Sequence, residues 1–261
     1  MRSDLPAHET YLRFADTLAD VSRAMLCGVA DQRPDVELKA DASYVTATDK
    51  AVEAALRDRI AERFPDHGIL GEEWGRENLG AEFVWVLDPI DGTAPFIAGL
   101  PVYGTLIGLA WGGRPYLGII DLPATAMRFA GVSGRFATRD GAPVRVRHCG
   151  ALAPAFVTCS SPDFMAPADQ VRFAEIRRLA QYVQYGGSCH AYAMLASGRT
   201  DLAVDGGLDP VDVYACAAVI EGAGGIMTDW TGAPLSFDMT GTVLAAGDKA
   251  CLDEAITHLA G

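Results

Sequence analysis

The stretch VWVLDPIDGTAPFIAGLP, residues 84–101, joins a short apolar run to a turn rich in carboxylates. The apolar run is typical of a buried β-strand, and this strand ends at Asp88, three residues before Asp91. Pro89 stiffens the chain between the two acids because its ring fixes one backbone dihedral. The stretch therefore predicts a strand end at which two carboxylates converge on one point.

The residues after Asp91 have features that favour the binding of an anion. Gly92 lets a backbone NH approach an anion closely, and a helix that begins near Thr93 would offer it free NH groups and a favourable dipole. An alternative without chemistry is that Asp88 and Asp91 only cap a turn, because Asp-Pro and Asp-Gly are ordinary turn dipeptides.

Two other acidic segments favour the chemical interpretation. ILGEEW at 69–74 places Glu72 and Glu73 in a loop bounded by glycines, and VTATD at 45–49 places Asp49 just before a helix. Each alone is also explained by a solvated acidic loop. Brought into one cleft, these carboxylates need compensating charge, which hard divalent cations with oxygen ligands supply. Magnesium fits that demand, and a pair of such ions can bind phosphate oxygens and lower the pKa of a bound water.

The N-terminal half is predicted to hold two helices followed by strands. Apolar spacing predicts an amphipathic helix over 11–29 and a second helix after Asp49, which ends at Pro65 and carries Glu53 on its polar face. Short apolar runs bounded by Gly, Pro and Asp predict strands at 83–87, 105–110, 116–121 and 127–130.

The C-terminal half alternates strands with helices. Strands are expected at AFVTCS, YVQY, LAVD, GIMTD and TVLAA, with helices near 169–180, 188–197 and 211–223 and at the end of the chain. This alternation is typical of an α/β arrangement. A boundary near 148–153 divides the chain into 1–150, an α+β half with most of the acids, and 151–261, an α/β half. Because no long linker separates them, we expect the halves to share a site.

Composition limits the partners. The 261 residues include 34 acidic and 21 basic side chains, a formal charge of −13, so the surface should repel nucleic acid and anionic membranes. The absence of a leader or of a run near eighteen apolar residues predicts a cytoplasmic protein. The six cysteines contain no CxxC pair and are expected to be buried free thiols.

Together these segments resemble the inositol monophosphatase superfamily of lithium-sensitive, magnesium-dependent phosphatases. The matching pieces are Asp49 in VTATD, Glu72 in GEE, DPIDGT from Asp88 to Thr93, and Asp212 with the EGAGG of 221–225. The resemblance implies a layered α/β/α/β/α sandwich, an assembly as a homodimer, and two or three Mg²⁺ ions per site.

The resemblance also assigns roles to residues. It implies that the metals are held by Glu72, Asp88, the Ile90 carbonyl, Asp91 and Asp212. Asp49 and Thr93, with Glu72, would act on the attacking water, and the amides of Gly92 and Thr93 would bind phosphate. Lys39 either faces the site or is a solvated lysine, and Asp209 either faces the pocket or caps a helix.

The substrate is suggested by residues 186–232, which resemble the histidinol-phosphate phosphatase branch. That likeness implies that Ser188, Asp205 and Asp212 contact the substrate, whose amine suits an acidic pocket. Two residues depart from the branch pattern, since Ser188 stands in place of Asp and Asp205 in place of Glu. His190 is either a substrate contact or a packing residue. Inositol 1-phosphate, a sugar bisphosphate and a nucleotide such as adenosine 3′,5′-bisphosphate stay open as substrates, as does a catalytically silent homologue with a binding role.

Overall fold

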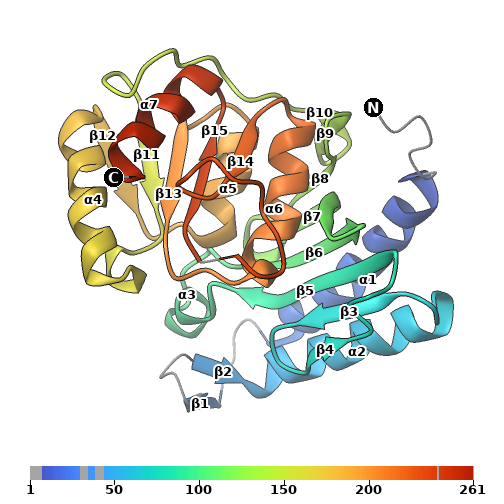
Figure 1. The fold of residues 1–261 in the computed structure, drawn as a ribbon. Coiled ribbons are helices and arrows are strands. Elements are labelled where there is room, and N and C mark those ends of the chain that lie inside the picture. The colour runs from blue at the N-terminus through green and yellow to red at the C-terminus, as the bar shows by residue number, and fades with distance from the viewer. Residues whose placement is uncertain (1–7, 30–34, 39–43, 240, 261) are drawn as a thin grey trace.

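A computed structural model describes residues 8–29, 35–38, 44–239 and 241–260. Five layers alternate in Figure 1: a helix pair, a large sheet, a second helix pair, a smaller sheet and a third helix pair. The helices are α1 (His8–Val29), α2 (Ala47–Arg63), α3 (Thr93–Ala98), α4 (Pro167–Leu179), α5 (Ser188–Ala196), α6 (Pro210–Gly222) and α7 (Lys249–Leu259). The α/β/α/β/α sandwich expected from the sequence is confirmed.

The larger sheet carries the carboxylate-rich stretch. Its eight strands lie in the order β10-β9-β8-β7-β6-β5-β3-β4, antiparallel except that β3 and β5 are parallel. The bounds are β3 (Gly68–Gly71), β4 (Gly75–Glu77), β5 (Phe83–Asp91), β6 (Gly104–Trp111), β7 (Arg114–Leu122), β8 (Met127–Val132), β9 (Phe136–Arg139) and β10 (Ala142–Pro143). Separately, β1 (Val36–Leu38) and β2 (Tyr44–Thr46) form an antiparallel pair.

The smaller sheet belongs to the C-terminal half. Its strands lie in the order β12-β11-β13-β15-β14. β12, β11 and β13 are parallel to one another, and β15 is antiparallel to both of its neighbours, β13 and β14. The bounds are β11 (Phe156–Cys159), β12 (Tyr182–Tyr185), β13 (Leu202–Asp205), β14 (Ile226–Thr228) and β15 (Val243–Ala246). Two short 3₁₀ helices, η1 (Pro123–Thr125) and η2 (Pro162–Phe164), complete the elements.

Alternation along β5 divides the core into two clusters. Trp85 and Leu87 pack with α1 and α2 on the outer face of the larger sheet, whereas Val84 and Val86 face α5 and α6. Because successive side chains of a strand point to opposite faces, a continuous apolar run serves both layers. The smaller sheet is also buried on both faces, with Leu202 and Val204 on the side of α4 and α7.

A row of glycines lets α6 lie unusually close to the larger sheet. Gly108, Gly118 and Gly131 are cross-strand neighbours on β6, β7 and β8. A Cβ on Gly118 would overlap the carbonyl oxygen of Ala215 in α6, and one on Gly131 would lie 2.5 Å from the Cα of Val219. The inner layer therefore depends on the absence of side chains at these positions.

Three expectations from the sequence need correction. α2 begins at Ala47, so Asp49 lies in its first turn rather than before it. β5 runs on to Asp91 instead of ending at Asp88. Glu53 was expected on the polar face of α2 but is fully buried, and its carboxylate accepts backbone hydrogen bonds from the turn after β3 there.

The expectation of buried thiols is met by five of the six cysteines, whereas Cys27 is exposed on α1.

The division into 1–150 and 151–261 stays a prediction. α5 and α6 lie beyond that boundary, yet they pack on the inner face of the larger sheet, so the halves share one core cluster.

Candidate metal centre and active site

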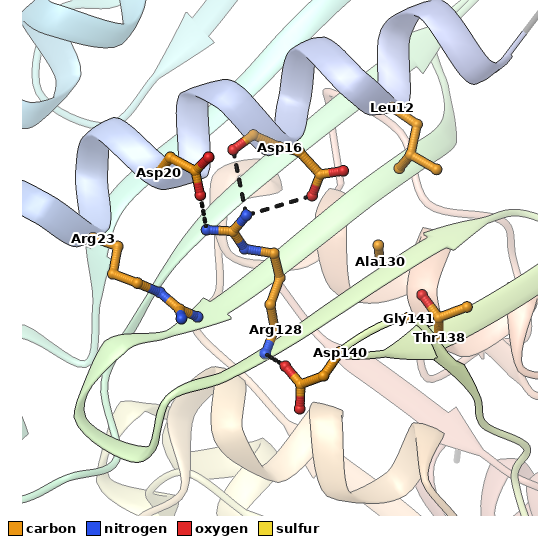
Figure 2. Close-up of a pocket in the computed structure, with 9 residues that line it drawn as sticks. All are labelled: Leu12, Asp16, Asp20, Arg23, Arg128, Ala130, Thr138, Asp140 and Gly141. Atoms are coloured by element: carbon orange, nitrogen blue, oxygen red, sulfur yellow. Dashed lines mark hydrogen bonds and ion pairs between the residues drawn. The ribbon is translucent and has the colours of Figure 1, made fainter.

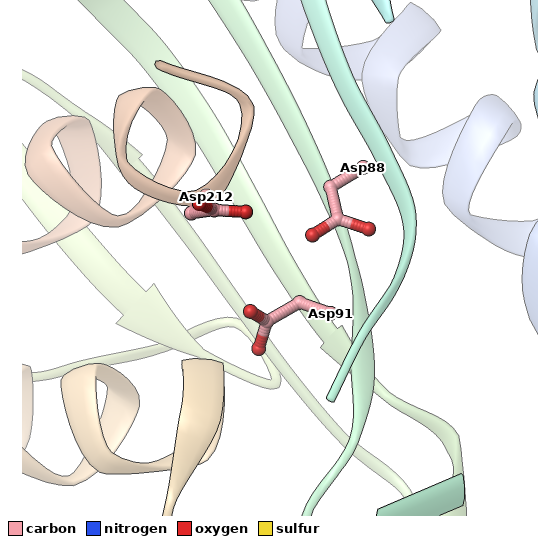
Figure 3. A group of neighbouring side chains, drawn as sticks. All are labelled: Asp88, Asp91 and Asp212. Carbon is pink, nitrogen blue, oxygen red and sulfur yellow. The ribbon is translucent and has the colours of Figure 1, made fainter. Parts of the chain in front are cut away.

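Three carboxylates from two distant segments meet between the larger sheet and α6. Asp88 and Asp91 lie at the end of β5 and Asp212 at the start of α6, and Figure 3 shows their side chains directed toward one another. One carboxylate oxygen from each lies within 4.8 Å of the others. The structure therefore brings together three of the acids that the sequence assigned to one site, and their role as metal ligands stays a prediction.

A β-bulge explains how Asp88 and Asp91 reach the same side of the sheet. Residues three apart on a regular strand point to opposite faces. Here Asp88 pairs with Leu106 and Asp91 with Gly104, so two residues of β5 lie opposite the single residue Thr105 of β6. The extra residue reverses the alternation. Ile90 consequently packs in the outer core, while both acids face inward.

The start of α6 positions Asp212. Asp209 is the N-cap residue of this helix, and its NH donates to Oδ2 of Asp212 at 2.7 Å. Asp212 thus takes the third position of the helix, with its other oxygen left for the acidic cluster. Of the two interpretations of Asp209, the helix cap is the one that this geometry favours.

Burial and mutual repulsion disfavour the charged forms of these acids. Burial, followed by the charges of Glu72, Asp91 and Asp212, holds the pKa of Asp88 well above its usual range. Burial and then Asp91 do the same to the pKa of Asp212. Burial raises the pKa of Asp91 to about 6 despite opposing hydrogen bonds from Cys189. A bound cation would reverse these shifts, because it favours the charged carboxylates.

Glu72 and Asp49 border the cluster. Glu72 lies in the turn between β3 and β4, and its carboxylate contributes a hydrogen bond and a charge to the raised pKa of Asp88. Asp49 is fully buried, and its Oδ2 accepts from the Thr46 NH at 2.8 Å and from the Thr46 hydroxyl. Burial first, and then the charge of Glu72, raises the pKa of Asp49.

Two buried carboxylate oxygens are available to a cation. Oδ1 of Asp49 and Oδ1 of Asp88 have no hydrogen-bond partner among the described residues. Leaving a buried polar atom unpaired costs on the order of 1–3 kcal/mol. A hard cation with oxygen ligands would satisfy such atoms, and the three residues that converge here, Asp88, Asp91 and Asp212, all offer carboxylate oxygens. The residues present therefore fit Mg²⁺.

The loop after Asp91 has the form expected of an anion-binding turn. Gly92 adopts φ +84°, in the left-handed region that favours glycine, and α3 begins at Thr93. The Thr93 hydroxyl donates to the carbonyl oxygen of Ile90 at 3.1 Å. A Cβ on Gly92 would lie 2.9 Å from Oγ of Ser188, which places Ser188 directly beside this loop.

Asp205 lies at the end of β13 and is nearly fully buried. One of its oxygens accepts from the NH of Ser160 at 2.6 Å and the other from the Tyr192 hydroxyl at 2.7 Å. Its charge also raises the pKa of Asp91, so Asp205 extends the acidic field of the cluster. Its predicted contact with the substrate, and that of the half-buried His190, stay predictions.

Residues to which the sequence assigned no role also support the site. Glu53 holds the turn that carries Glu72, because its carboxylate accepts from the NH groups of Glu73 and Trp74. Cys189 donates its NH to Oδ2 of Asp91 at 2.5 Å. Thr46 alone left a signal, since Thr46 and Asp49 have the spacing of a capping box.

A cavity of about 430 Å³ lies elsewhere, against α1 and β8. Figure 2 shows Arg128 at its centre with Asp16, Asp20 and Asp140 around it. The guanidinium of Arg128 is already paired with acids, among them Asp20 at 2.8 Å. None of the predicted site residues lines this cavity, so the acidic cluster is the stronger candidate for chemistry.

Two other expectations concern Lys39 and membranes. Lys39 lies outside the described residues. Among the residues that the structure describes, none of the helices combines the length and apolar character needed to cross a bilayer.

Comparisons with known proteins agree with this geometry. The model of the inositol monophosphatase family matches residues 7–260. The chain is 39% identical over 259 residues to a bifunctional phosphatase, IMPL2, of Arabidopsis thaliana, covering 95% of this chain and 75% of that protein. It is 34% identical over 213 residues to a histidinol-phosphatase of Chlorobaculum parvum, covering 79% and 80%.

A solved structure supports the same conclusion. An inositol monophosphatase from Zymomonas mobilis superposes with a TM-score of 0.90 at 37% identity, covering 98% of this chain and all of that one. Both relatives are phosphatases by name, and the family match spans nearly the whole chain. With its sandwich fold and converging acids, this chain is a phosphoric monoester hydrolase that belongs to the inositol monophosphatase family.

Proposed function

We propose that this enzyme hydrolyses a small metabolite phosphate with Mg²⁺ held by Asp88, Asp91 and Asp212, together with Glu72 and the Ile90 carbonyl. The observation that carries the proposal is the convergence within 4.8 Å of three carboxylates from β5 and α6, of which that of Asp88 is buried and those of Asp91 and Asp212 are half-buried. When bound, the ions would neutralise phosphate charge and lower the pKa of a water molecule.

The chain's own residues have separate tasks in this proposal. Asp49 and Thr93, with Glu72, orient the attacking water, and the amides of Gly92 and Thr93 hold the phosphate at the start of α3. The sequence offers no nucleophile motif of the GxSxG kind, so we expect direct in-line attack without a phosphoenzyme. Trapping a phosphorylated residue during turnover would contradict that mechanism.

We propose L-histidinol phosphate as the substrate, which would place the reaction in histidine biosynthesis. Relatives named histidinol-phosphatase are 34% identical, and the acidic field that extends from the cluster to Asp205 suits a substrate with an ammonium group. Inositol 1-phosphate is the second candidate, because the inositol monophosphatase from Zymomonas mobilis is 37% identical.

A phosphate-release assay with Mg²⁺ decides between them. The panel compares histidinol phosphate, inositol 1-phosphate, fructose 1,6-bisphosphate and adenosine 3′,5′-bisphosphate, with Asp91→Asn protein from the same purification as the control for contaminating phosphatase. We expect kcat/KM for histidinol phosphate to exceed the others by at least about tenfold, a difference that one good charged contact supplies. A preference for inositol 1-phosphate would overturn the substrate assignment, and Mg²⁺-independent release would overturn the metal assignment.

The homodimer and the cytoplasmic location stay predictions from the sequence and the resemblance. Three large apolar side chains are exposed on η2, α4 and β12, namely Phe164, Val171 and Tyr182, and a partner subunit that covered them would remove apolar surface from water. A light-scattering mass equal to one chain, 27.6 kDa, would contradict the dimer.

A further inference from the structure

The bulge that turns Asp91 inward is held by a hydroxyl. Thr105 is the residue of β6 that lies opposite the two residues Pro89 and Ile90 of β5. Its Oγ1 donates to the carbonyl oxygen of Pro89 at 2.8 Å. Because proline lacks an NH, no reciprocal pair of backbone hydrogen bonds can form at Pro89. The Thr105 side chain provides a hydrogen bond there instead.

A second hydroxyl completes this contact from α1. Ser22 and Thr105 are both fully buried, and their hydroxyl oxygens are in close hydrogen-bonding contact. A hydroxyl has one proton, and that of Thr105 goes to the Pro89 carbonyl, which can only accept. Ser22 is therefore the donor to Thr105, and the order of donation runs from Ser22 to Thr105 to Pro89.

The neighbouring contacts hold α1 at the same place. Asp121 of β7 is the cross-strand neighbour of Thr105 and is fully buried. Arg23, next to Ser22 on α1, donates from Nε and Nη2 to the two carboxylate oxygens of Asp121 at 3.0 and 2.7 Å. A buried charge that is paired with good geometry resists displacement, so the Ser22 hydroxyl has a fixed position relative to β6.

We propose that Thr105, supported by Ser22, is a positioning residue for cation binding. It keeps the bulge in the form that directs Asp88 and Asp91 to one point. Both hydroxyl residues lie outside the DPIDGT segment in the sequence. Repulsion among the acids tends to open the metal-free cluster, and the hydrogen bond to Pro89 opposes that opening. This inference rests on the proposed binding of Mg²⁺ by the cluster.

The test compares matched variants of the full chain. Thr105→Val keeps the shape and removes the donor, Thr105→Ser keeps the donor, and Ser22→Ala removes the support. Thr228→Val is the control, because Thr228 is also a strand residue whose hydroxyl donates to a backbone carbonyl, at 2.8 Å, and it lies on β14 in the smaller sheet. Mg²⁺ affinity is measured by isothermal titration calorimetry, and thermal unfolding is followed without metal.

We expect Thr105→Val to weaken Mg²⁺ binding about three- to tenfold, the range that one net hydrogen bond supplies. Ser22→Ala should weaken it less, and Thr105→Ser and Thr228→Val should bind as the wild type does. Thr105→Val should also lose more thermal stability than Thr228→Val, because it leaves the buried Ser22 hydroxyl and the Pro89 carbonyl without their partner. Thr105→Ser keeps both hydrogen bonds, so wild-type Mg²⁺ affinity in that variant separates the hydrogen bond from the loss of side-chain packing.

Each outcome bears on the proposal. Unchanged Mg²⁺ affinity in Thr105→Val, or a loss in Thr105→Ser as large as in Thr105→Val, overturns the positioning role while leaving the proposed function intact. A wild-type chain that binds no Mg²⁺ and needs none for phosphate release overturns both.

Discussion

Asp91 illustrates how single residues in the site meet opposing requirements. Cys189 holds it through a backbone NH at 2.5 Å, while Glu72 and Asp205 repel its charge. Its orientation is therefore fixed by the protein, but its ionised form is disfavoured until a cation is bound. The same conflict applies to Asp88 and Asp212, whose pKa values are also raised by burial and by neighbouring acids.

Replacing Asp91 by Asn separates catalysis from stability. The amide oxygen can still accept from Cys189, but the ligand charge is lost, so we expect phosphate release to fall on the order of a thousandfold or more. Thermal unfolding of the metal-free protein should occur at an equal or higher temperature, because one repelling carboxylate is removed. Phosphate release assays and calorimetry measure the two effects. Activity near the wild-type level would show that Asp91 is not a metal ligand.

Some residues of the site could be predicted from the sequence and others could not. DPIDGT and GEE identify the acids because metal chemistry needs those residue types at that spacing. Glu53 escaped notice because its place on α2 has the same pattern as a solvated glutamate, and only the folded turn after β3 supplies its donors. Thr105 was missed because its role depends on register with β5.

At the scale of elements, α6 links the metal site to the core. Its residues from Val211 to Ile220 are nearly all buried, and its N-terminus supplies Asp212. The closeness of α6 to the larger sheet follows from the glycines on β6, β7 and β8. The position of one metal ligand is therefore set by packing along the whole helix.

Gly118→Ala tests that dependence. The added methyl would overlap the Ala215 carbonyl, so α6 must shift, and we expect a loss of about 1–3 kcal/mol in the free energy of unfolding together with weaker Mg²⁺ binding. Urea titration and calorimetry measure these changes. Gly80→Ala is the control, since a Cβ there meets nothing within 4 Å. Equal behaviour of the two variants would contradict the close-packing account.

Length alone does not separate the predicted elements from the missed ones. The apolar patterns located α1, α2, β5 to β8 and every strand and helix expected after residue 150, because their apolar runs are bounded by clear turn residues, although β11 to β15 have only three or four residues each. No such pattern indicated β1 to β4, β9 and β10, which have two to four residues each. Such strands exist because a neighbouring strand pairs with them, and a single sequence does not contain that information.

At the scale of the whole molecule, contacts outside the active site also join the two halves. Arg147, in the segment before β11, makes paired hydrogen bonds of 2.5 Å to both carboxylate oxygens of Asp201. Asp201 also accepts from the NH of Phe156 at 2.7 Å. Burial raises the pKa of Asp201, but the Arg147 guanidinium and this NH outweigh it, so the pKa is lowered overall.

The lowered pKa of Asp201 predicts a pH-dependent contribution to stability. A carboxyl group with a depressed folded pKa stabilises the protein above its unfolded value, about 3.9, and this contribution is lost as the pH falls through the folded pKa. Asp201→Asn should therefore lower the urea midpoint at pH 7, and the difference from the wild type should shrink below about pH 4. Asp253→Asn, which removes an exposed pair with Lys249, should change little at either pH. A midpoint difference that is independent of pH would contradict this interpretation.

The most direct test of the whole account is an anomalous difference map from crystals of the full chain grown with Mn²⁺, a scatterer that takes the oxygen ligands of Mg²⁺. We expect at least one peak among the carboxylates of Asp88, Asp91 and Asp212, at metal–oxygen distances of roughly 2.0–2.3 Å. A map from fully loaded crystals with no peak between these three side chains would contradict it.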